Sequence, residues 1–316
     1  MSRVLLTDHI AADAVRVLES FGGIEAVAMG TPAPAELIRL VADFDAIVVR
    51  SPTHVTADVI EAGVKLRFIG RAGVGVDNID VAAATQRGIV VINSPRSNTI
   101  STAEHTIAMI LALAREIPRA HASVVAGKWE RDSFKGTELF GKTLGVVGLG
   151  RVGREVATRA LAFGMKVLGH DPVVGDADAR ALGVRWVPLA ELFANSDWVT
   201  VHTPLSSTTR GLVGAREIAS MKRGVRIVNC ARGGIINEAA LADALDSGHV
   251  AAVAMDVFEA EPPGANRLLS HPRSVFSPHL GAATTDAQER VATDVAESIG
   301  LALARGEIRD AVNAPR

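Results

Sequence analysis

A glycine-rich turn near the middle of the chain constrains the fold more than any other feature. Gly148, Gly150 and Gly153 follow an apolar run and precede an amphipathic one, and a second apolar run ends further on. The spacing G-x-G-x-x-G is weak evidence alone, but here it lies between a predicted strand and a predicted helix. The first glycine permits a tight turn, the second lets a pyrophosphate approach the backbone, and the third allows close helix–strand packing. The stretch therefore predicts a strand–helix–strand unit that binds a dinucleotide.

The residue that ends the second apolar run indicates which dinucleotide binds. The N-terminus of the predicted helix offers N–H groups without intrahelical partners, which suit phosphates. About twenty residues beyond the turn, Asp171 occupies the place where an acidic side chain binds ribose hydroxyls and repels a 2′-phosphate. The stretch therefore predicts NAD rather than NADP. The glycine-rich segment 70–75 has a different spacing and no acidic strand end, so we expect a loop that approaches a small ligand.

Predicted strands alternate with amphipathic helices along most of the chain, with one interruption. After Pro95 come a long apolar helix at 99–117, which Pro118 is expected to end, and a polar arm at 127–141. Such alternation predicts α/β domains with doubly wound parallel sheets. The helix predicted at 286–306 is expected to return to the N-terminal domain. The two expected domains are a flavodoxin-like substrate-binding domain, residues 1–95 and 284–316, and an inserted Rossmann NAD-binding domain, residues 96–283, which includes the long helix and the arm.

Composition excludes several classes of protein. The 316 residues include 33 Lys and Arg and 35 Asp and Glu, a net charge of −2, whereas chains that bind nucleic acid are usually more basic. No apolar run reaches the roughly 18 residues of a membrane span, and the N-terminus lacks the layout of a signal peptide. The single cysteine, Cys230, excludes an internal disulfide and suits a reducing compartment. We expect a cytoplasmic protein that binds small molecules, with no metal, nucleic-acid or membrane partner.

Side chains suited to proton transfer and carboxylate binding follow the last predicted strands. His279 ends the final strand, where ligand crevices open in doubly wound sheets, and imidazole titrates in the range of a general base. Arg232 also follows a strand, and its guanidinium can hold a carboxylate through two hydrogen bonds. Asp256, Glu259 and Glu261 follow the next strand. One of these carboxylates could orient the imidazole, and the spacing does not choose among the three.

The other histidines have simpler interpretations. His105 lies in the long apolar helix and is expected in a core or an interface. His170 and His202 end strands near the predicted cofactor, and packing explains both. The remaining histidines occur in polar or loop contexts and are expected at the surface: His9, His54, His121, His249 and His271.

The segments around these residues resemble the D-isomer-specific 2-hydroxyacid dehydrogenases, and the similarity covers nearly the whole chain. The segments that carry it are GLGRVGREVATRALAFGMKV, VHTPLSSTTRGL, NCARGGIINEAALADAL, AMDVFEAEPP and SPHLGAAT. The segments VVRSPTHV, GRAGVGVDNID, NSPRSNTISTAEHTIAMILALAR and GKWERDSFKGTELFGKTLG are most similar to the branch of the family that oxidises 3-phosphoglycerate. The resemblance implies a homodimer built through the long helix and arm, and members of this branch often form homotetramers.

The resemblance also implies roles for individual residues. It implies that Glu261 is the carboxylate that pairs with His279, the acid/base, and that Arg232 binds the substrate. The remaining substrate-binding residues that it implies are Val74 and Gly75, through backbone N–H groups at the carboxylate, and Arg50 and Arg71, at a phosphate. The cofactor-binding residues that it implies, besides the three glycines, are Arg151 and Val152 at the pyrophosphate, Asp171 at the ribose, and Thr203, Cys230, Ala231 and Asp256, the last near the nicotinamide amide.

The implied activity is the NAD-dependent oxidation of 3-phosphoglycerate to 3-phosphohydroxypyruvate, the entry to serine biosynthesis. One alternative on the same scaffold is a glyoxylate/hydroxypyruvate reductase or another D-2-hydroxyacid dehydrogenase. An alternative of another class is an NAD-sensing binding protein similar to corepressors of this fold, but no peptide-docking surface is identifiable. Many members of the branch continue into serine-binding regulatory modules, whereas this chain ends at Arg316. We therefore expect either a naturally short form or a shortened chain.

Overall fold

The computed structural model describes residues 1–10 and 12–313, which form two compact units. The first unit comprises Met1–Asn98 and Ala283–Arg316, and the second comprises Thr99–Ala282. Ala11 and residues 314–316, which fall within the expected substrate-binding domain, lie outside the described residues. The roles assigned above to the two domains stay predictions.

The first unit contains a five-stranded parallel sheet with the strand order β2-β1-β3-β4-β5. Its strands are β1 (Ser2–Leu6), β2 (Ile24–Ala28), β3 (Ala46–Val49), β4 (Phe68–Arg71) and β5 (Val90–Asn93). Alternate residues of a strand face opposite sides, so Val4 and Leu6 enter one hydrophobic core while Leu5 enters another. Burial on both faces explains why these strands read as continuous apolar runs. The strand order is the predicted flavodoxin-like one.

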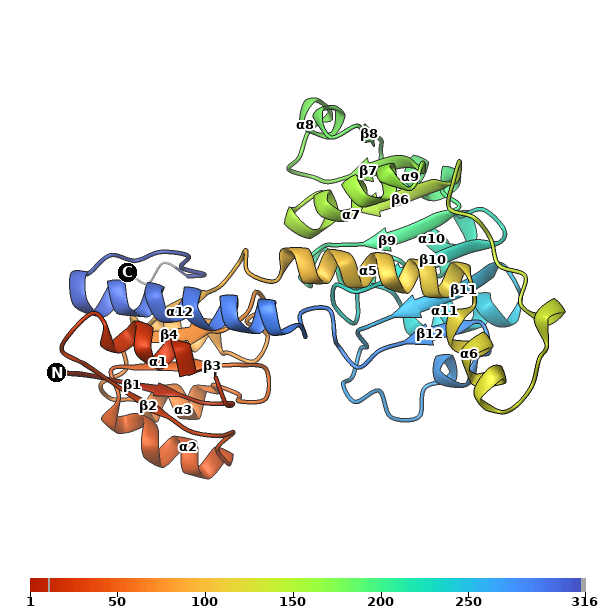
Figure 1. The fold of residues 1–316 in the computed structure, drawn as a ribbon. Coiled ribbons are helices and arrows are strands. Elements are labelled where there is room, and N and C mark those ends of the chain that lie inside the picture. The colour runs from red at the N-terminus through yellow and green to blue at the C-terminus, as the bar shows by residue number, and fades with distance from the viewer. Residues whose placement is uncertain (11, 314–316) are drawn as a thin grey trace. The chain divides into compact units, whose positions relative to one another are not determined.

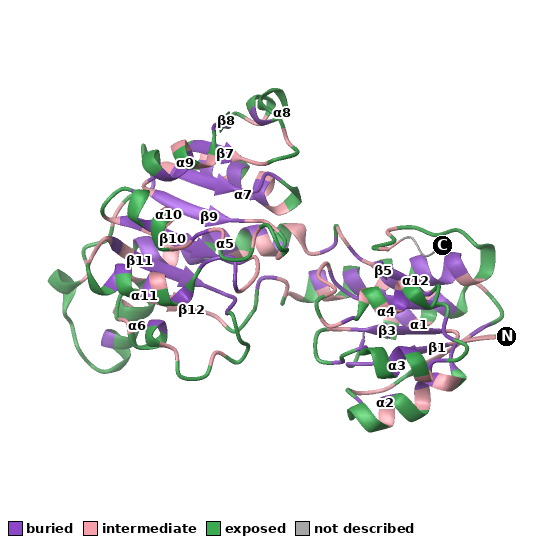
Figure 2. Ribbon diagram, turned by 180° about the vertical axis from the view of Figure 1, so that it is seen from behind, coloured by how far each residue is buried: buried purple, intermediate pink, exposed green. Residues whose placement is uncertain are grey.

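Helices cover both faces of this sheet, as Figures 1 and 2 show. They are α1 (Ala12–Glu19), α2 (Pro34–Leu40), α3 (Ala57–Ala62), α4 (Val81–Gln86) and α12 (Thr285–Arg305), with a 3₁₀ turn η1 (Val41–Asp43). The red α1 and the blue α12 lie side by side in Figure 1, although they come from opposite ends of the chain. Val295 and Ile299 of α12 pack into the core that Val4 enters. The C-terminal helix is thus part of the first unit.

The second unit contains a seven-stranded parallel sheet with the order β12-β11-β10-β9-β6-β7-β8. Its strands are β6 (Thr143–Val147), β7 (Lys166–His170), β8 (Arg185–Trp186), β9 (Trp198–Val201), β10 (Val225–Asn229), β11 (Val250–Met255) and β12 (Ser274–Phe276). The chain runs from β6 to one edge of the sheet, then returns beside β6 and continues to the other edge. This is the Rossmann order, and its switch point lies between β6 and β9. The predicted fold class, two doubly wound α/β sheets, is confirmed.

The helices of the second unit differ from the prediction at one place. They are α5 (Thr99–Ala114), α6 (Ile117–Val125), α7 (Arg151–Ala162), α8 (Asp176–Ala181), α9 (Leu189–Asn195), α10 (Ala215–Ser220) and α11 (Glu238–Asp246), with 3₁₀ turns η2 (Arg131–Ser133) and η3 (Arg267–Ser270). The helix predicted at 99–117 ends at Ala114, and Glu116 has a φ of +51°. Pro118 lies in the first turn of α6, where proline is tolerated, so it begins a helix instead of ending one.

The sheet of the second unit is buried on both faces. Helices α5 and α7 share one hydrophobic core with the sheet, and α9, α10 and α11 share the other. Figure 2 shows the central strands of both sheets in the colour of buried residues. In the part of the chain that is described, no helix combines the length and apolar character needed to cross a membrane.

Candidate active site

At two positions of the turn after β6, neighbouring atoms lie too close for any residue but glycine. Gly148 has a φ of +96°, and a Cβ atom there would lie 2.7 Å from the carbonyl oxygen of His202, just after β9. A Cβ atom on Gly153 would overlap the carbonyl oxygen of Gly148, which lies under the first turn of α7. Any side chain at either position would push the turn or the helix away. These contacts agree with the roles that the motif predicts for its first and third glycines.

Gly150 has the opposite environment. No atom lies within 4 Å of the position that its Cβ would occupy, and it is the N-cap residue of α7. Its carbonyl oxygen accepts a hydrogen bond from the N–H of Arg154 at 3.0 Å, so Arg151 and Val152 lie in the first turn, where N–H groups lack intrahelical partners. An open N-cap in front of such N–H groups suits a phosphate.

Asp171 closes the glycine turn through its carboxylate. Oδ2 accepts a hydrogen bond from the N–H of Leu149 at 2.8 Å, and Oδ1 accepts from the N–H groups of Val173 and Val174 at 2.8 and 3.0 Å. Burial raises the pKa of Asp171, but the three N–H donors outweigh it, and the pKa lies below its usual value. The carboxylate is therefore ionised at neutral pH and is held against the turn.

The other residues predicted to line the cofactor follow β9 and β10. The hydroxyl of Thr203 is buried and has no hydrogen-bond partner among the described residues, which costs about 1–3 kcal/mol unless a ligand supplies one. Burial raises the pKa of the Cys230 thiol to about 12, so this thiol is neutral and poorly nucleophilic. The N–H of Ala231 donates to Oδ1 of the buried Asn229 at 3.0 Å. The open N-cap, the unpartnered hydroxyl and the Asp171 carboxylate together fit a dinucleotide.

His279 and Glu261 are joined by a hydrogen bond between Nδ1 and Oε2 at 2.7 Å. The second oxygen of Glu261 accepts from the N–H of Phe258 at 3.1 Å, so this carboxylate connects the loops that follow β11 and β12. Burial raises the pKa of Glu261, but the hydrogen bond and charge of His279 and the Phe258 N–H lower it below its usual value. An ionised Glu261 accepts from the Nδ1 proton, which leaves Nε2 of His279 to exchange protons.

The carboxylates that the sequence left open as alternatives have other partners. The Glu259 carboxylate accepts a hydrogen bond through Oε1 from the N–H of Glu238 at 3.3 Å, and the Glu259 N–H donates to Oε1 of Glu238 at 2.5 Å. Asp256 is buried, and His105 of α5 approaches its Oδ1 with Nε2 at 3.2 Å. The Asp256 carboxylate accepts hydrogen bonds from three donors of the loop that carries His279: Ser277 Oγ at 2.6 Å, Leu280 N at 2.7 Å and Gly281 N at 2.8 Å.

Asp256 therefore holds the position of the His279 loop. The backbone contributes as well, since the N–H of His279 donates to the carbonyl oxygen of Asp256 at 2.8 Å. Burial raises the pKa of Asp256, but the hydrogen bonds from His105, Ser277 and the two N–H groups lower it below its usual value. The sequence analysis did not predict the contact between His105 and Asp256, because nothing in the local pattern shows that two residues so far apart in the chain meet.

Arg232 lies on the loop after β10, which is pressed against the loop after β11. A Cβ atom on Gly233 would overlap the carbonyl oxygen of Phe258, so only glycine allows this approach. The Arg232 backbone is fixed as well, because Nδ2 of Asn229 donates to its carbonyl oxygen at 2.9 Å. Its Nη1 donates to the carbonyl oxygen of Ala231 at 2.7 Å. Asn229, a buried amide at the end of a strand, was not anticipated as the residue that orders this loop.

In the first unit, the loop after β4 offers two adjacent N–H groups. Within residues 1–10 and 12–313, the N–H groups of Val74 and Gly75 donate to no other protein atom. The loop is held from behind, since Nδ2 of Asn93 donates to the carbonyl oxygen of Val74 at 2.6 Å. Successive unpaired N–H groups form a concave site for an anion.

The two arginines predicted to face a substrate phosphate lie at strand ends of the first unit: Arg50 directly follows β3, and Arg71 is the last residue of β4. The guanidinium of Arg71 donates to the carbonyl oxygen of Ala72 at 3.0 Å and to Oγ of Ser51 at 2.7 Å. Arg50 is positioned through its backbone, whose N–H donates to Oδ2 of the buried Asp8 at 2.8 Å. Burial raises the pKa of Asp8, but its hydrogen bonds with Thr53, Arg50 and other donors lower it below its usual value. Asp8 was not among the predicted site residues.

Comparison with known proteins identifies the family that this arrangement represents. A family model described as "D-isomer specific 2-hydroxyacid dehydrogenase, NAD binding domain" matches residues 107–281. The chain belongs to this family. The matched residues lie within the second unit, and NAD is the cofactor. The predicted family and cofactor are thus confirmed.

The similar proteins include enzymes that are named for different substrates. A D-3-phosphoglycerate dehydrogenase of Methanocaldococcus jannaschii is 50% identical over 317 residues, which cover 100% of this chain and 60% of that relative. The chain thus spans less than two thirds of its length. A glyoxylate reductase from Paecilomyes thermophila has a TM-score of 0.89, 32% identity and 98% coverage of both chains. A D-lactate dehydrogenase from Aquifex aeolicus, complexed with NAD and lactic acid, has a TM-score of 0.84 and 28% identity, with 99% of this chain and 100% of that one covered.

Proposed function

We propose that this protein is an NAD-dependent D-2-hydroxyacid dehydrogenase that oxidises 3-phosphoglycerate to 3-phosphohydroxypyruvate in serine biosynthesis. The observation that carries the proposal is the 2.7 Å hydrogen bond between His279 and Glu261 at the carboxyl edge of the sheet. The glycine turn opens at the same edge, where ligands of doubly wound sheets bind. The similarity to a D-3-phosphoglycerate dehydrogenase supports the choice of substrate.

Three residues of the second unit, His279, Glu261 and Arg232, have definite tasks in this reaction. Bound NAD supplies a hydride acceptor for the C2 hydrogen of the hydroxy acid. Nε2 of neutral His279 takes the hydroxyl proton, and Glu261 stabilises the imidazolium that results. Arg232 binds the carboxylate and polarises the carbonyl as it forms. The products are the 2-oxo acid, NADH and a protonated His279, which releases its proton to solvent.

The first unit supplies groups for the substrate's anionic ends. The N–H groups of Val74 and Gly75, which lack protein partners in the described part of the chain, suit the carboxylate. The guanidinium groups of Arg50 and Arg71 suit a phosphate, because each presents paired donors. A phosphorylated hydroxy acid is therefore the proposed substrate, in preference to glycerate, lactate or glyoxylate.

The experiment that tests the substrate combines a panel with one double variant. Wild-type turnover is compared for 3-phosphoglycerate, glycerate and lactate in oxidation, and for hydroxypyruvate and glyoxylate in reduction. We expect Arg50→Glu with Arg71→Glu to raise KM for 3-phosphoglycerate roughly 10–100-fold, as loss of charged hydrogen bonds predicts, and to affect glycerate much less. Equal losses for both substrates would remove the phosphate assignment. Preference of the wild type for glyoxylate or hydroxypyruvate would assign a reductase instead.

We expect a strong preference for NAD over NADP that depends on Asp171. Asp171→Ala should weaken NADH binding and narrow the difference between the two cofactors, since the repulsion of a 2′-phosphate is lost. Asp171→Asn is the matched control, because it keeps an oxygen acceptor beside Val173 and Val174 while removing the charge. Fluorescence titration with NADH and NADPH gives both affinities. Similar catalytic efficiency of the wild type with NAD and NADP would contradict the prediction.

The pH profile tests Glu261. Oxidation requires neutral His279, so its rate should rise with pH, and reduction should fall. In Glu261→Gln the carboxylate that stabilises the imidazolium is gone, so the rising limb should move to lower pH. The measurement is kcat/KM for 3-phosphoglycerate between pH 5 and 10. An unchanged profile would exclude Glu261 from the proton transfer.

We also propose that the protein is cytoplasmic and forms a homodimer, or a tetramer of such dimers, through α5, α6 and the arm at 127–141. Large apolar side chains gather in α6 and the arm with much of their surface exposed: Ile117, Val124, Val125, Trp129 and Phe140. Such gatherings on a soluble protein mark contact surfaces. Sedimentation of the wild type and of Trp129→Ser tests the dimer, and a monomeric wild type would rule it out.

A further inference from the structure

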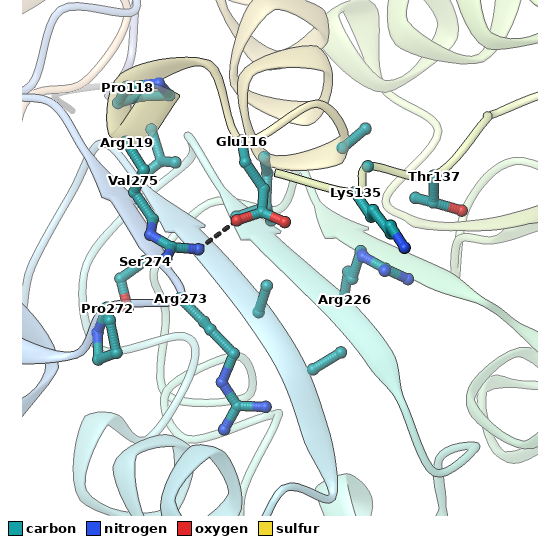
Figure 3. Close-up of a pocket in the computed structure, with 15 residues that line it drawn as sticks. Glu116, Pro118, Arg119, Lys135, Thr137, Arg226, Pro272, Arg273, Ser274 and Val275 are labelled. Atoms are coloured by element: carbon teal, nitrogen blue, oxygen red, sulfur yellow. Dashed lines mark hydrogen bonds and ion pairs between the residues drawn. The ribbon is translucent and has the colours of Figure 1, made fainter. Parts of the chain in front are cut away.

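The amino edge of the second unit's sheet contains a cavity that the proposed reaction does not use. The cavity has a volume of about 270 Å³ and is lined where β10, β11 and β12 begin, by residues that include Arg226, Ala251 and Ser274. The end of α5, the start of α6 and the base of the arm complete its walls (Figure 3). The loops with Arg232 and His279 follow the opposite ends of these strands, which are about 10–17 Å away at 3.3 Å per residue.

Cationic side chains dominate the lining of this cavity. The lining contains four cations, Arg119, Lys135, Arg226 and Arg273, and a single carboxylate, that of Glu116, which forms an ion pair with Arg119 (Figure 3). The guanidinium of Arg273 donates to a backbone carbonyl oxygen. Within the described residues, the side chains of Lys135 and Arg226 form no hydrogen bond or ion pair. Two cations of this wall thus lack a counter-charge in contact.

A second hollow, of about 200 Å³, shares Thr137 and Arg226 with the first. It adds Lys142, Lys222 and Arg223, and its one carboxylate pairs with Lys222 at 3.0 Å. Cations therefore outnumber carboxylates in both hollows, although the whole chain has a net charge of −2. We call the two hollows together the amino-edge cationic site.

Arg226 lies where the two hollows meet, partly removed from water over the face of an aromatic ring. Its guanidinium carbon lies 5.1 Å from the centroid of the Trp198 ring, and Trp198 is fully buried. Burial lowers the pKa of Arg226, although the charges of Asp197 and Glu116 act in the opposite direction. Taking a charge partly out of water, beside other cations, costs free energy unless an anion compensates it.

A polar group of the first cavity also lacks a partner. The hydroxyl of Ser274 is buried and, among the described residues, has no hydrogen-bond partner. An unpaired hydroxyl of this kind adds to the cost of the empty wall. The cations of the lining provide both the charge and the hydrogen-bond donors that an oxyanion needs.

We propose that the amino-edge cationic site binds a small oxyanion of the phosphate class with two or more negative charges, held mainly by Lys135 and Arg226. Arginine offers a planar fork to such an anion, and lysine offers a compact point charge. The volume of the larger hollow admits a small anion and is too small for a whole dinucleotide. The site is thus independent of the NAD site at the other edge of the sheet.

Inorganic pyrophosphate is the probe that tests this site, by calorimetry and by thermal unfolding. We expect saturable binding to the wild type and a rise in Tm, because a ligand of the folded state stabilises it. Lys135→Gln with Arg226→Gln should weaken binding by roughly tenfold or more, the equivalent of at least ~1.4 kcal/mol. NADH binding and turnover should be unchanged. If the change at the partly buried Arg226 prevents folding, Lys135→Gln with Arg223→Gln is measured in its place. This second variant should also bind pyrophosphate more weakly than the wild type.

The matched control is Lys166→Gln with Arg180→Gln, which removes two cations of the same unit that do not line the hollows. This variant should bind pyrophosphate as the wild type does. Equal weakening in the control, or binding only above roughly 10 mM, would show a general charge effect and overturn the proposal. Citrate serves as a carboxylate probe, and tighter binding of citrate than of pyrophosphate would overturn the phosphate assignment.

A second copy of the chain, rather than a small anion, is the other possible occupant of the amino-edge cationic site. If the wild type binds no pyrophosphate while the Lys135→Gln, Arg226→Gln variant sediments as a smaller species, the cations serve contact between subunits and the proposal is wrong. If pyrophosphate binds without changing sedimentation, the proposal stands. None of these results depends on which hydroxy acid the active site oxidises.

Discussion

His279→Ala is expected to lower kcat by roughly 10²–10⁴-fold, the usual contribution of a general base, while NADH binds as before. Two other titratable groups that follow strands of the same sheet, His202 and Cys230, are poor substitutes for the imidazole. Burial lowers the pKa of His202 to about 4, so that ring stays neutral and is a weak base, and the Cys230 thiol has its pKa raised to about 12. Steady-state turnover of 3-phosphoglycerate and fluorescence titration with NADH measure the two properties separately.

His121→Ala is the control for this variant, because His121 is an exposed histidine of α6. It should retain wild-type turnover. A loss smaller than roughly tenfold in His279→Ala would mean that the general base lies elsewhere. Loss of NADH binding together with turnover would point to a folding defect in the loop, and Tm of the variant would reveal it.

Gly153→Ala is expected to abolish measurable NADH binding and to destabilise the second unit by ~1–3 kcal/mol, the usual cost of overpacking. The new methyl group would overlap the carbonyl oxygen of Gly148, so α7 must move away from the turn. That movement displaces the N–H groups proposed to bind the pyrophosphate. Thermal unfolding gives the stability, and fluorescence titration gives the affinity.

Gly150→Ala separates these two effects. Its Cβ position has no atom within 4 Å, so folding should be unaffected, but the methyl group would stand where the phosphates approach and NADH affinity should fall. Gly175→Ala, at the equally open N-cap of α8, should change neither property. Wild-type affinity for NADH in Gly153→Ala would contradict the contacts described here.

The alternation of apolar strands and amphipathic helices was sufficient to predict the fold, because its cause is local. A strand buried on both faces must be apolar throughout, as Ile47 and Val48 of β3 show by entering opposite cores. The division between α5 and α6 was missed for an equally physical reason. Proline is as compatible with the first turn of a new helix as with the end of an old one, and local sequence does not distinguish the cases.

The candidate site was predictable only where its contacts are close in sequence. The glycine turn and Asp171 belong to one strand–helix–strand unit, so their spacing defines them. The spacing of Asp256, Glu259 and Glu261 could not show which carboxylate meets His279, since that depends on how two loops fold over separate strands. The contact of His105 with Asp256 was likewise invisible, because it joins a helix to a strand from a distant part of the chain.

The three hydrogen bonds that Asp171 accepts bear on how the coenzyme specificity of this fold can change. One carboxylate both faces the ribose in the proposed complex and tethers Leu149 and Val173 around the glycine turn. Replacing it to admit a 2′-phosphate would loosen the turn that binds the rest of the molecule. A lineage that adopts the phosphorylated coenzyme must therefore acquire a new tether for the turn together with its new specificity. A change in coenzyme specificity and a change in the rigidity of the glycine turn therefore have to occur together.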